Sequence, residues 1–374
     1  MRTNKLVKWV FVLFGVFLLI IIAAFNVFGS TTHSDLKGNQ EQKIETFMDH
    51  KSLDSKFNGV VLVAKNGKAI FEKSYGYANV EARRLNQMNT QFRIASLTKS
   101  FTALSILQLE SRGKLKTTDP ISKYIKNFPN GNKITIHNLL THSSGIADHL
   151  KLTDTTKPIT MEAFINLMRK QDLLFTPGTK YKYSNTGYMI LAYILEKVSN
   201  ENYITYFQDH IFKPAGMGHT YLRKVEAKEF AIGYKNMKKV VEKDDESQLA
   251  GYGDIISTVD DMLKYDNAIH NGRLLSSKEI NKMETGYIDS ATGGVFKYGY
   301  GWNVANNSIS FGRPMIEHNG SLPGFKCEMV DFIKDRVTVI VLSNNNGTWN
   351  SGALARELAS LVLGTRFWFF QKYF

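Results

Sequence analysis

Ser96 and Lys99, three residues apart, form the pair in this sequence best placed to carry chemistry. On a helix, residues at this spacing share a face, so the lysine amine can reach the serine hydroxyl. A serine hydroxyl is a weak nucleophile until a base removes its proton, and a lysine can be that base only when it is neutral. The pair therefore predicts nucleophilic catalysis by Ser96, with Lys99 as its partner near the start of a helix over residues 96–112.

The same Ser-x-x-Lys spacing also begins at Ser34 and at Ser111. Ser34 belongs to a small polar segment, and Ser111 lies beside Gly113, where we expect the helix to end. Neither position offers a rigid, buried site. Ser96 instead follows a β-hairpin and begins an apolar helix, and this position favours it over the other two serines.

Two further motifs could complete the same site. Tyr183-Ser184-Asn185 follows the turn Pro177-Gly178 and precedes a helical pattern, so its phenol and its amide can point into one cleft. A phenol held near Lys99 could relay a proton. His318-Asn319-Gly320 lies on an expected strand, and on an edge strand a glycine lets a substrate backbone lie close. Tyr-x-Asn also occurs at Tyr77, Tyr234 and Tyr265, and His-x-Gly also occurs at His270. We therefore choose Tyr183 and His318 for their positions next to the expected elements, not for the patterns alone.

The elements that must position these residues are strands at both ends of the chain and helices between them. The turn Asn66-Gly67 joins two β-rich runs, 60–65 and 68–75, and is the strongest short-range hairpin signal. Later segments predict three more strands and a last helix, at 316–320, 325–332, 337–343 and 353–363. This order predicts an α+β fold, in which an antiparallel sheet closed by N- and C-terminal strands is flanked by helices and carries a helical insertion domain.

Residues 9–28 form a nearly unbroken apolar run, and the positive residues Arg2, Lys5 and Lys8 precede it. A helix of that length spans about 30 Å, the thickness of a hydrocarbon core. Positive charge before such a helix keeps the N-terminus in the cytoplasm. We therefore predict a cytoplasmic segment 1–8, a single-pass anchor at 9–28 in contact with membrane lipid, and an extracytoplasmic catalytic domain. A cleaved signal peptide is the alternative, although the run is long for one.

The rest of the chain divides into a polar stalk at 29–40, a catalytic domain at 41–365 and an aromatic, basic tail at 366–374. The net charge is +13, from 47 Lys and Arg against 34 Asp and Glu. A basic balance attracts polyanions, but zinc-finger spacing and RNA-binding aromatic signatures are lacking, so we expect no nucleic-acid partner. One cysteine, Cys327, allows no intramolecular disulfide. The histidines show no metal-ligand spacing, so we expect no metal and no other cofactor.

Taken together, these motifs resemble the class C β-lactamase superfamily, which also holds low-molecular-weight penicillin-binding proteins, D-amino-acid peptidases and related esterases. The motifs stand in family order over residues 41–365, and as a set they are highly specific. They are Ile94–Lys99, Leu139–Gly145, Pro177-Gly178 with Tyr183-Ser184-Asn185, Ser257–Asp261, His318-Asn319-Gly320 and Val341–Asn344. Within the second motif, we expect His142 to brace a turn.

The resemblance implies a role for each matching residue. Ser96 would be the acylated nucleophile, Lys99 its base partner and Tyr183 the proton relay. Asn185 would bind the amide of the substrate. The backbone N–H groups of Ser96 and Ser321 would form the oxyanion hole, which binds the charge that develops in the tetrahedral intermediate.

His318 departs from the β-lactamase pattern, in which the lysine of a Lys-Thr-Gly triplet holds this position. A lysine is charged at neutral pH and can bind a substrate carboxylate, whereas a histidine with an ordinary pKa is charged only in part. The histidine favours the peptidase and esterase branches, so we predict a serine hydrolase acting on D-alanyl peptide or ester bonds of the cell envelope. A true β-lactamase, with a β-lactam as substrate, and a catalytically silent penicillin-binding wall sensor are the alternatives.

Overall fold

The computed structural model describes residues 30–31, 36–55, 57–222, 229–291, 294–347 and 349–368. The predicted N-terminal segment and apolar run, residues 1–28, lie outside the described residues. So do part of the predicted stalk and residues 369–374 of the predicted tail.

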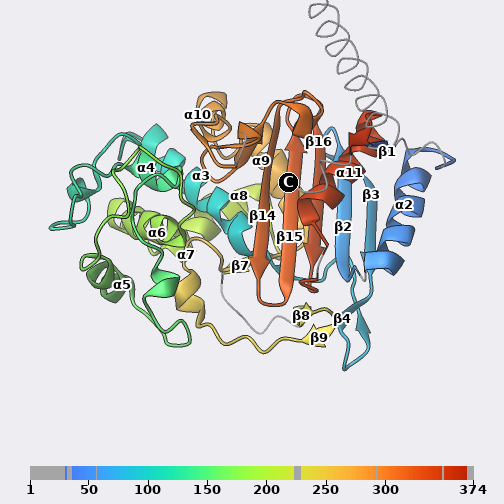
Figure 1. The fold of residues 1–374 in the computed structure, drawn as a ribbon, viewed down its shortest axis with the longest axis horizontal. Coiled ribbons are helices and arrows are strands. Elements are labelled where there is room, and N and C mark those ends of the chain that lie inside the picture. The colour runs from blue at the N-terminus through green and yellow to red at the C-terminus, as the bar shows by residue number, and fades with distance from the viewer. Residues whose placement is uncertain are drawn as a thin grey trace, which may run out of the picture.

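An eight-stranded antiparallel sheet forms the centre of the molecule (Figure 1). Its order is β11 (Ile288–Asp289), β12 (Lys297–Tyr298), β13 (Asn303–Ala305), β14 (Met315–Leu322), β15 (Phe325–Phe332), β16 (Val337–Ser343), β2 (Gly59–Lys65) and β3 (Lys68–Tyr75). The N-terminal pair β2 and β3 joins the C-terminal strand β16, so the two ends of the chain build one sheet. The predicted α+β fold is confirmed, and the sheet is open, with β11 and β3 at its edges.

The hairpin of β2 and β3 forms at the predicted turn. Asn66 and Gly67 both have positive φ, 52° and 72°, as a two-residue turn between twisted strands requires. Lys65 and Lys68 close the ladder on either side of the turn. The turn chemistry thus fixes the register of this edge of the sheet.

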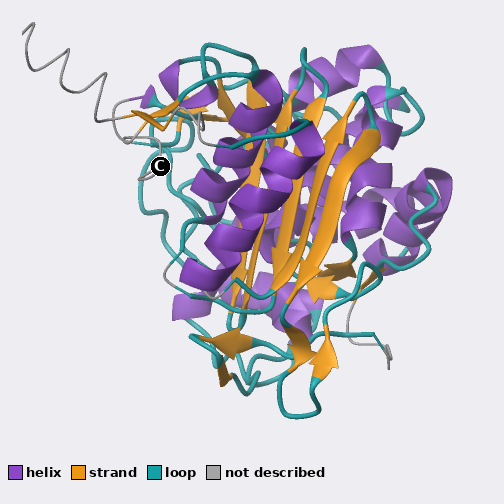
Figure 2. Ribbon diagram, turned by 90° about the vertical axis from the view of Figure 1, so that its right-hand side faces the viewer, coloured by secondary structure: helices purple, strands orange, loops and turns teal. Residues whose placement is uncertain are grey.

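Helices cover both faces of the sheet (Figure 2). α2 (Gln40–Ser55) and α11 (Ser351–Leu363) pack on one face, and α9 (Val259–His270) packs on the other. Strand β16 serves both layers, because side chains alternate between the faces of a strand. Val339 and Val341 belong to the core beneath α11, whereas Ile340 and Leu342 belong to the core on the opposite face.

The middle of the chain forms a helical part beside the sheet, at the left of Figure 1. Its helices are α3 (Thr98–Ser111), α4 (Ile136–Leu140), α5 (Met161–Met168), α6 (Asn185–Ser199), α7 (Tyr203–Phe207), α8 (Lys213–Ala215) and α10 (Ser277–Met283). A three-stranded sheet joins this part, in the order β6 (Phe92–Arg93), β10 (Ile255–Ser257) and β7 (Tyr221–Leu222). Helix α3 is buried from Thr98 to Leu109 and packs against α6, so the two form a rigid support for the site.

Short strand pairs complete the described structure. They are β4 (Tyr77–Asn79) with β5 (Arg84–Leu85), β8 (Tyr234–Lys235) with β9 (Lys238–Lys239), and β1 (Ser30–Thr31) with β17 (Phe367–Trp368). The last pair joins residues from the two ends of the described chain.

The predicted single-pass location in the cell membrane is contradicted. Within the described ranges, no helix is both long enough and apolar enough to cross a membrane. The longest, α2, has 16 residues. At 1.5 Å per residue such a helix spans about 24 Å, less than a hydrocarbon core of about 30 Å. The lipid contact is therefore unsupported, and the run 9–28, on which the prediction rested, lies outside the described residues.

Candidate active site

Ser96 lies in a tight turn that precedes α3. The turn is a 3-10 segment, Ala95–Leu97, and Ala95 adopts a left-handed conformation with a φ of 50°. The helix predicted over 96–112 therefore begins at Thr98 and ends at Ser111. The left-handed residue redirects the chain as it leaves β6, and backbone conformations of this kind cluster at functional sites.

Lys99 is fully buried and directed at Ser96. Its Nζ lies 3.0 Å from Ser96 Oγ and 2.9 Å from Asn185 Oδ1, and it donates to the Tyr252 carbonyl oxygen at 3.3 Å. Burial lowers the pKa of Lys99 well below its ordinary value, and the negative charge of Asp148 opposes this shift. A lysine with a lowered pKa can supply the neutral amine that deprotonation of a serine requires.

Tyr183 lies at the mouth of the site, and 37% of its surface is exposed. The centroid of its ring is 4.8 Å from Lys99 Nζ. Burial around the hydroxyl raises the pKa of Tyr183, and its interaction with Ser96 acts in the opposite direction. The phenol is therefore protonated at neutral pH.

Asn185 is the first residue of α6, and its amide links two parts of the site. Its Oδ1 accepts from Lys99 at 2.9 Å, and its Nδ2 lies 3.4 Å from Asp148 Oδ2. The structure thus brings Ser96, Tyr183 and Asn185 together around the amine of Lys99, although the four residues come from two separate segments of the chain.

His318 lies in β14, is only 1% exposed, and has both ring nitrogens occupied. Nδ1 is 2.7 Å from the Asn319 carbonyl oxygen, and Nε2 is 2.9 Å from the Tyr298 hydroxyl. Because a carbonyl oxygen only accepts, Nδ1 carries the proton and the Tyr298 hydroxyl donates to Nε2. Burial, and the charge that Lys99 carries when it is protonated, lower the pKa of His318 to about 3. The imidazole is therefore neutral at physiological pH, not partly charged as expected, and offers no cation to a substrate carboxylate.

Gly320 brings β14 against the turn that carries Ser96. A Cβ at this position would lie 2.2 Å from the Ile94 carbonyl oxygen and 3.2 Å from Ala95 Cβ, so only glycine fits the approach. The chain's own backbone thus occupies the space that we expected to receive a substrate. Ser321 follows at an exposed position, where its Oγ accepts from Asn346 Nδ2 at 3.2 Å.

Beside the site, β14 has a free edge. Strand β13 pairs with β14 only from Met315 to Glu317. Among the described strands, none continues this pairing along residues 318–322. An unpaired strand edge can bind an extended chain through backbone hydrogen bonds. His318-Asn319-Gly320 therefore pairs with β15 on one side and has an unpaired edge on the side of β13, next to the turn of Ser96.

His142 lies within a group of aromatic rings beneath Tyr183. Its backbone is left-handed, with a φ of 56°, and its Nδ1 accepts from the Ser184 backbone N–H at 3.1 Å. Its ring centroid lies 4.3 Å from that of Tyr183 and 4.5 Å from that of Tyr298. Burial lowers the pKa of His142 well below its ordinary value, so the ring is neutral. These contacts hold the backbone that carries Tyr183, as expected of a residue that braces a turn.

Two residues of the site, Asp148 and Tyr298, are absent from the sequence predictions. Tyr298 begins the run Tyr298-Gly299-Tyr300-Gly301-Trp302, whose alternation of aromatic residues and glycine is a signal that could have identified it. A Cβ at Gly301 would lie 2.8 Å from Ser100 Cα, so this run packs closely against the start of α3. No comparable pattern surrounds Asp148, which comes from a loop between α4 and α5.

The competing serines do not form such a site. Ser111 Oγ donates to the Gln108 carbonyl oxygen at 2.9 Å, within the last turn of α3. Lys114 lies beyond the end of that helix. Ser34 lies outside the described residues.

One group of metal-ligand type occurs in the part of the chain that the structure describes, formed by Asp266, His270 and Asp331. His270 Nε2 lies 2.7 Å from Asp331 Oδ2 and 3.5 Å from Asp266 Oδ1. Burial lowers the pKa of His270, but the hydrogen bond and charge of Asp331 outweigh it, so the pKa is raised. Burial and the charge of Asp331 raise the pKa of Asp266 to about 7. The bonds of His270 to the two carboxyl groups account for this group as a buried polar cluster.

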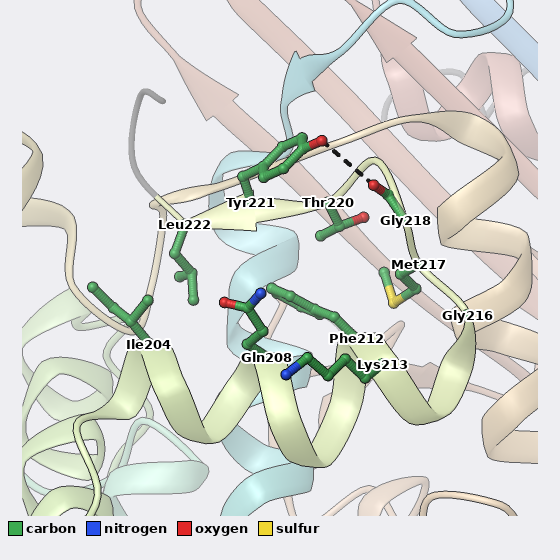
Figure 3. A pocket seen from close by; sticks show the side chains of 10 residues that line it. All are labelled: Ile204, Gln208, Phe212, Lys213, Gly216, Met217, Gly218, Thr220, Tyr221 and Leu222. Atoms are coloured by element: carbon green, nitrogen blue, oxygen red, sulfur yellow. Dashed lines mark hydrogen bonds between the residues drawn. The ribbon is translucent and has the colours of Figure 1, made fainter. Parts of the chain in front are cut away.

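A separate hollow of about 490 Å³ lies between α7, the helical segment 208–212 and β7 (Figure 3). Apolar side chains form much of its wall, among them Phe212, Met217 and Leu222. Lys213 is the charged residue in the lining, and Asp209 pairs with it. None of the predicted site residues lines this hollow, so it is distinct from the site of Ser96.

Comparison with known sequences points to one family. The model of the family described as Beta-lactamase matches residues 41–363. The Bacillus subtilis protein PbpX is 38% identical over 312 residues, which are 82% of this chain and 74% of that protein. A penicillin-binding protein of the same species is 31% identical over 332 residues, or 83% of this chain and 73% of that protein.

Solved structures share the fold. A penicillin-binding protein homologue from Pyrococcus abyssi is 31% identical and matches with a TM-score of 0.77, over 86% of this chain and 77% of that chain. A class C beta-lactamase matches with a TM-score of 0.76, over 86% of this chain and 97% of that chain. Its identity is 21%, so this second likeness concerns the fold alone.

Proposed function

Because the chain belongs to the beta-lactamase family, we propose that it is a serine hydrolase that forms an acyl-enzyme at Ser96 with D-alanyl peptides or esters of the cell envelope. One observation carries the proposal. The Nζ of a buried lysine with a lowered pKa lies 3.0 Å from the hydroxyl of Ser96. This arrangement supports Lys99 as the base that a serine nucleophile needs.

In acylation, Ser96 Oγ attacks the carbonyl carbon of the substrate while its proton passes to the amine of Lys99. The backbone N–H groups of Ser96 and Ser321 bind the oxyanion of the tetrahedral intermediate. Collapse of the intermediate breaks the bond to the leaving alcohol or amine, which takes up the proton from Lys99 by way of Tyr183. Water then attacks the acyl group and gives one proton to the same base, and Ser96 leaves with that proton.

The charges in the site favour a substrate whose leaving group carries no carboxylate. His318 is neutral, and both of its nitrogens are already bonded within the protein. A carboxylate without a cation loses a charge-assisted hydrogen bond, worth about 1.5–3 kcal/mol. We therefore place an ester of D-alanine ahead of a D-alanyl-D-alanine peptide and of a β-lactam, both of which carry that carboxylate.

The proposal is tested by turnover of three substrates by the purified chain. These are a D-alanyl ester of a neutral alcohol, an acylated D-alanyl-D-alanine peptide and a chromogenic cephalosporin. We expect the highest kcat/KM for the ester. Ser96→Ala should lower it by at least about 10³-fold, whereas Ser111→Ala, the matched Ser-x-x-Lys serine, should leave it unchanged.

Two results would contradict the proposal in different ways. Fastest turnover of the cephalosporin would identify a true β-lactamase. Covalent binding of a penicillin at Ser96 without turnover of any substrate would identify a silent penicillin-binding sensor.

A further inference from the structure

Asp148 lies behind the side-chain amide of Asn185, on the loop that precedes the short 3-10 segment His149–Lys151. Its Oδ2 accepts hydrogen bonds from the backbone N–H of Asn185 at 3.2 Å and from Asn185 Nδ2 at 3.4 Å. Its Oδ1 accepts from the Leu150 backbone N–H at 3.2 Å. With 19% of its side chain exposed, the carboxylate is mostly shielded from water, so its charge acts over a longer range than a surface charge would.

The bonds of Asp148 decide which way the Asn185 amide points. A carboxylate only accepts, so it binds the NH₂ end of the amide and leaves the carbonyl end free. That carbonyl end accepts from Lys99 Nζ at 2.9 Å. With the amide reversed, its NH₂ group would face the lysine and compete with the Ser96 hydroxyl for the lone pair of the neutral amine. A continuous chain of hydrogen bonds therefore runs from Asp148 through Asn185 to Lys99 and on to Ser96.

Asp148 also supplies negative charge next to a buried amine. Its charge favours the protonated form of Lys99, against burial, which favours the neutral form. The same carboxylate affects Tyr183 and Tyr252 on either side of the amine. The titratable groups that face Lys99 from the surrounding elements are Asp148, His142, Tyr183, Tyr188, Tyr252 and His318. Asp148 is the carboxylate in this set, so no second carboxylate within it can replace its charge. His149 faces Asp148 itself, with its Nδ1 3.7 Å from Asp148 Oδ1, and burial lowers the pKa of this histidine against the charge of Asp148.

We propose that Asp148 is a positioning residue for acylation, which orients the Asn185 amide toward Lys99 and, through its negative charge, fixes the pH range over which Ser96 reacts. This inference rests on the proposed function, because it assumes that Ser96 is acylated. A purely structural role, as the cap of the 3-10 segment that follows, is the simpler explanation to be separated from it.

Asp148→Asn separates the two roles. One carboxylate oxygen accepts from Leu150 and the other from Asn185, so the single amide oxygen of an asparagine can keep the Leu150 bond, and with it the cap, while the charge and the bonds to Asn185 are lost. Without the charge, Lys99 loses its proton at lower pH. The acid limb of the rate profile should therefore move to lower pH by about one unit, the smaller end of the shifts caused by a neighbouring charge.

The experiment is the rate of acylation by a fluorescent penicillin from pH 5 to pH 9, for the full chain and its variants. Asp154→Asn is the matched control, because Asp154 is an exposed aspartate of the same loop region whose carboxylate bonds to Thr156 and pairs with Lys157. We expect its profile to coincide with the wild type, and that of Asp148→Asn to be displaced. If Asp148→Asn does not fold, Asp148→Ser, which also lacks the charge and keeps an acceptor, should show the same displacement.

A profile of Asp148→Asn or Asp148→Ser that is lower at every pH, with an unmoved acid limb, would overturn the inference and leave Asp148 as a cap. A wild-type chain that is acylated at no pH by the penicillin and that turns over no D-alanyl ester of a neutral alcohol would overturn the proposed function, and the inference with it. The two failures are therefore distinguishable, because only the first requires an active wild-type protein.

Discussion

At the scale of single residues, burial lowers the pKa values of the three basic groups of the site, Lys99, His142 and His318. A proton on Lys99 would further disfavour a positive charge on either histidine. Asp148 opposes this trend at one point, the amine of Lys99. This suits a serine hydrolase, because an amine with a lowered pKa can more readily be free to accept the serine proton, while histidines with lowered pKa values are weak competitors for that proton.

The neutral state of His318 predicts the behaviour of His318→Gln. With a pKa of about 3, the wild-type imidazole does not titrate between pH 5 and pH 8. Gln can accept from the Tyr298 hydroxyl in its place. The acylation rate of the variant by a penicillin, plotted against pH, should therefore keep the shape of the wild-type curve over this range. A wild-type limb with a midpoint near 6.5 that disappears in His318→Gln would show that the imidazole titrates after all.

At the scale of elements, strand β14 is held from two directions. On one side Gly320 meets the turn of Ser96. On the other, Arg356 of α11 makes two hydrogen bonds to Glu317, at 2.7 and 2.6 Å, and both side chains are buried. Because breaking a buried ion pair leaves an uncompensated charge, this pair fixes the position of β14 on the helix. The strand that carries His318 is thus placed by packing on both of its faces.

Gly320→Ala tests the contact between β14 and the nucleophile turn. Its Cβ would meet the backbone of Ile94 at 2.2 Å, and a backbone atom cannot rotate away. We expect an acylation rate at least about tenfold lower, and a free energy of unfolding lower by about 1–3 kcal/mol, as for other overpacked sites. Gly218→Ala is the control, because a Cβ there meets nothing within 4 Å. Acylation of Gly320→Ala at the wild-type rate would show that the approach is loose.

At the scale of the whole molecule, the site exists only when both ends of the chain meet. Ser96 follows the strands of the N-terminal hairpin, and His318 lies on a strand of the C-terminal half. Pairing of β2 with β16 joins these halves in one sheet. The sequence predicts this sheet well, because the Asn66-Gly67 turn and the long runs of β15 and β16 carry strong local signals.

Other features of the fold and of the site could not be predicted from local sequence patterns. Strands β6, β7, β11 and β12 have two residues each, too few to show a period. Asp148 and Tyr298 reach the site from loops and short strands far from Ser96 in the sequence, so only tertiary structure reveals them. The same is true of the pKa of His318, which depends on burial. The membrane location, predicted from one apolar run, is the part that the structure contradicts.

The most direct test of the central claim is peptide mapping by mass spectrometry after the purified chain has reacted with a penicillin. We predict one adduct, with the mass of the intact penicillin, on the peptide that contains Ser96. Lys99→Ala should slow its formation by about 10²–10⁴-fold, whereas Lys114→Ala, the lysine of the competing Ser111 pair, should not. An adduct on any other residue, or one that persists in Ser96→Ala, would contradict the account.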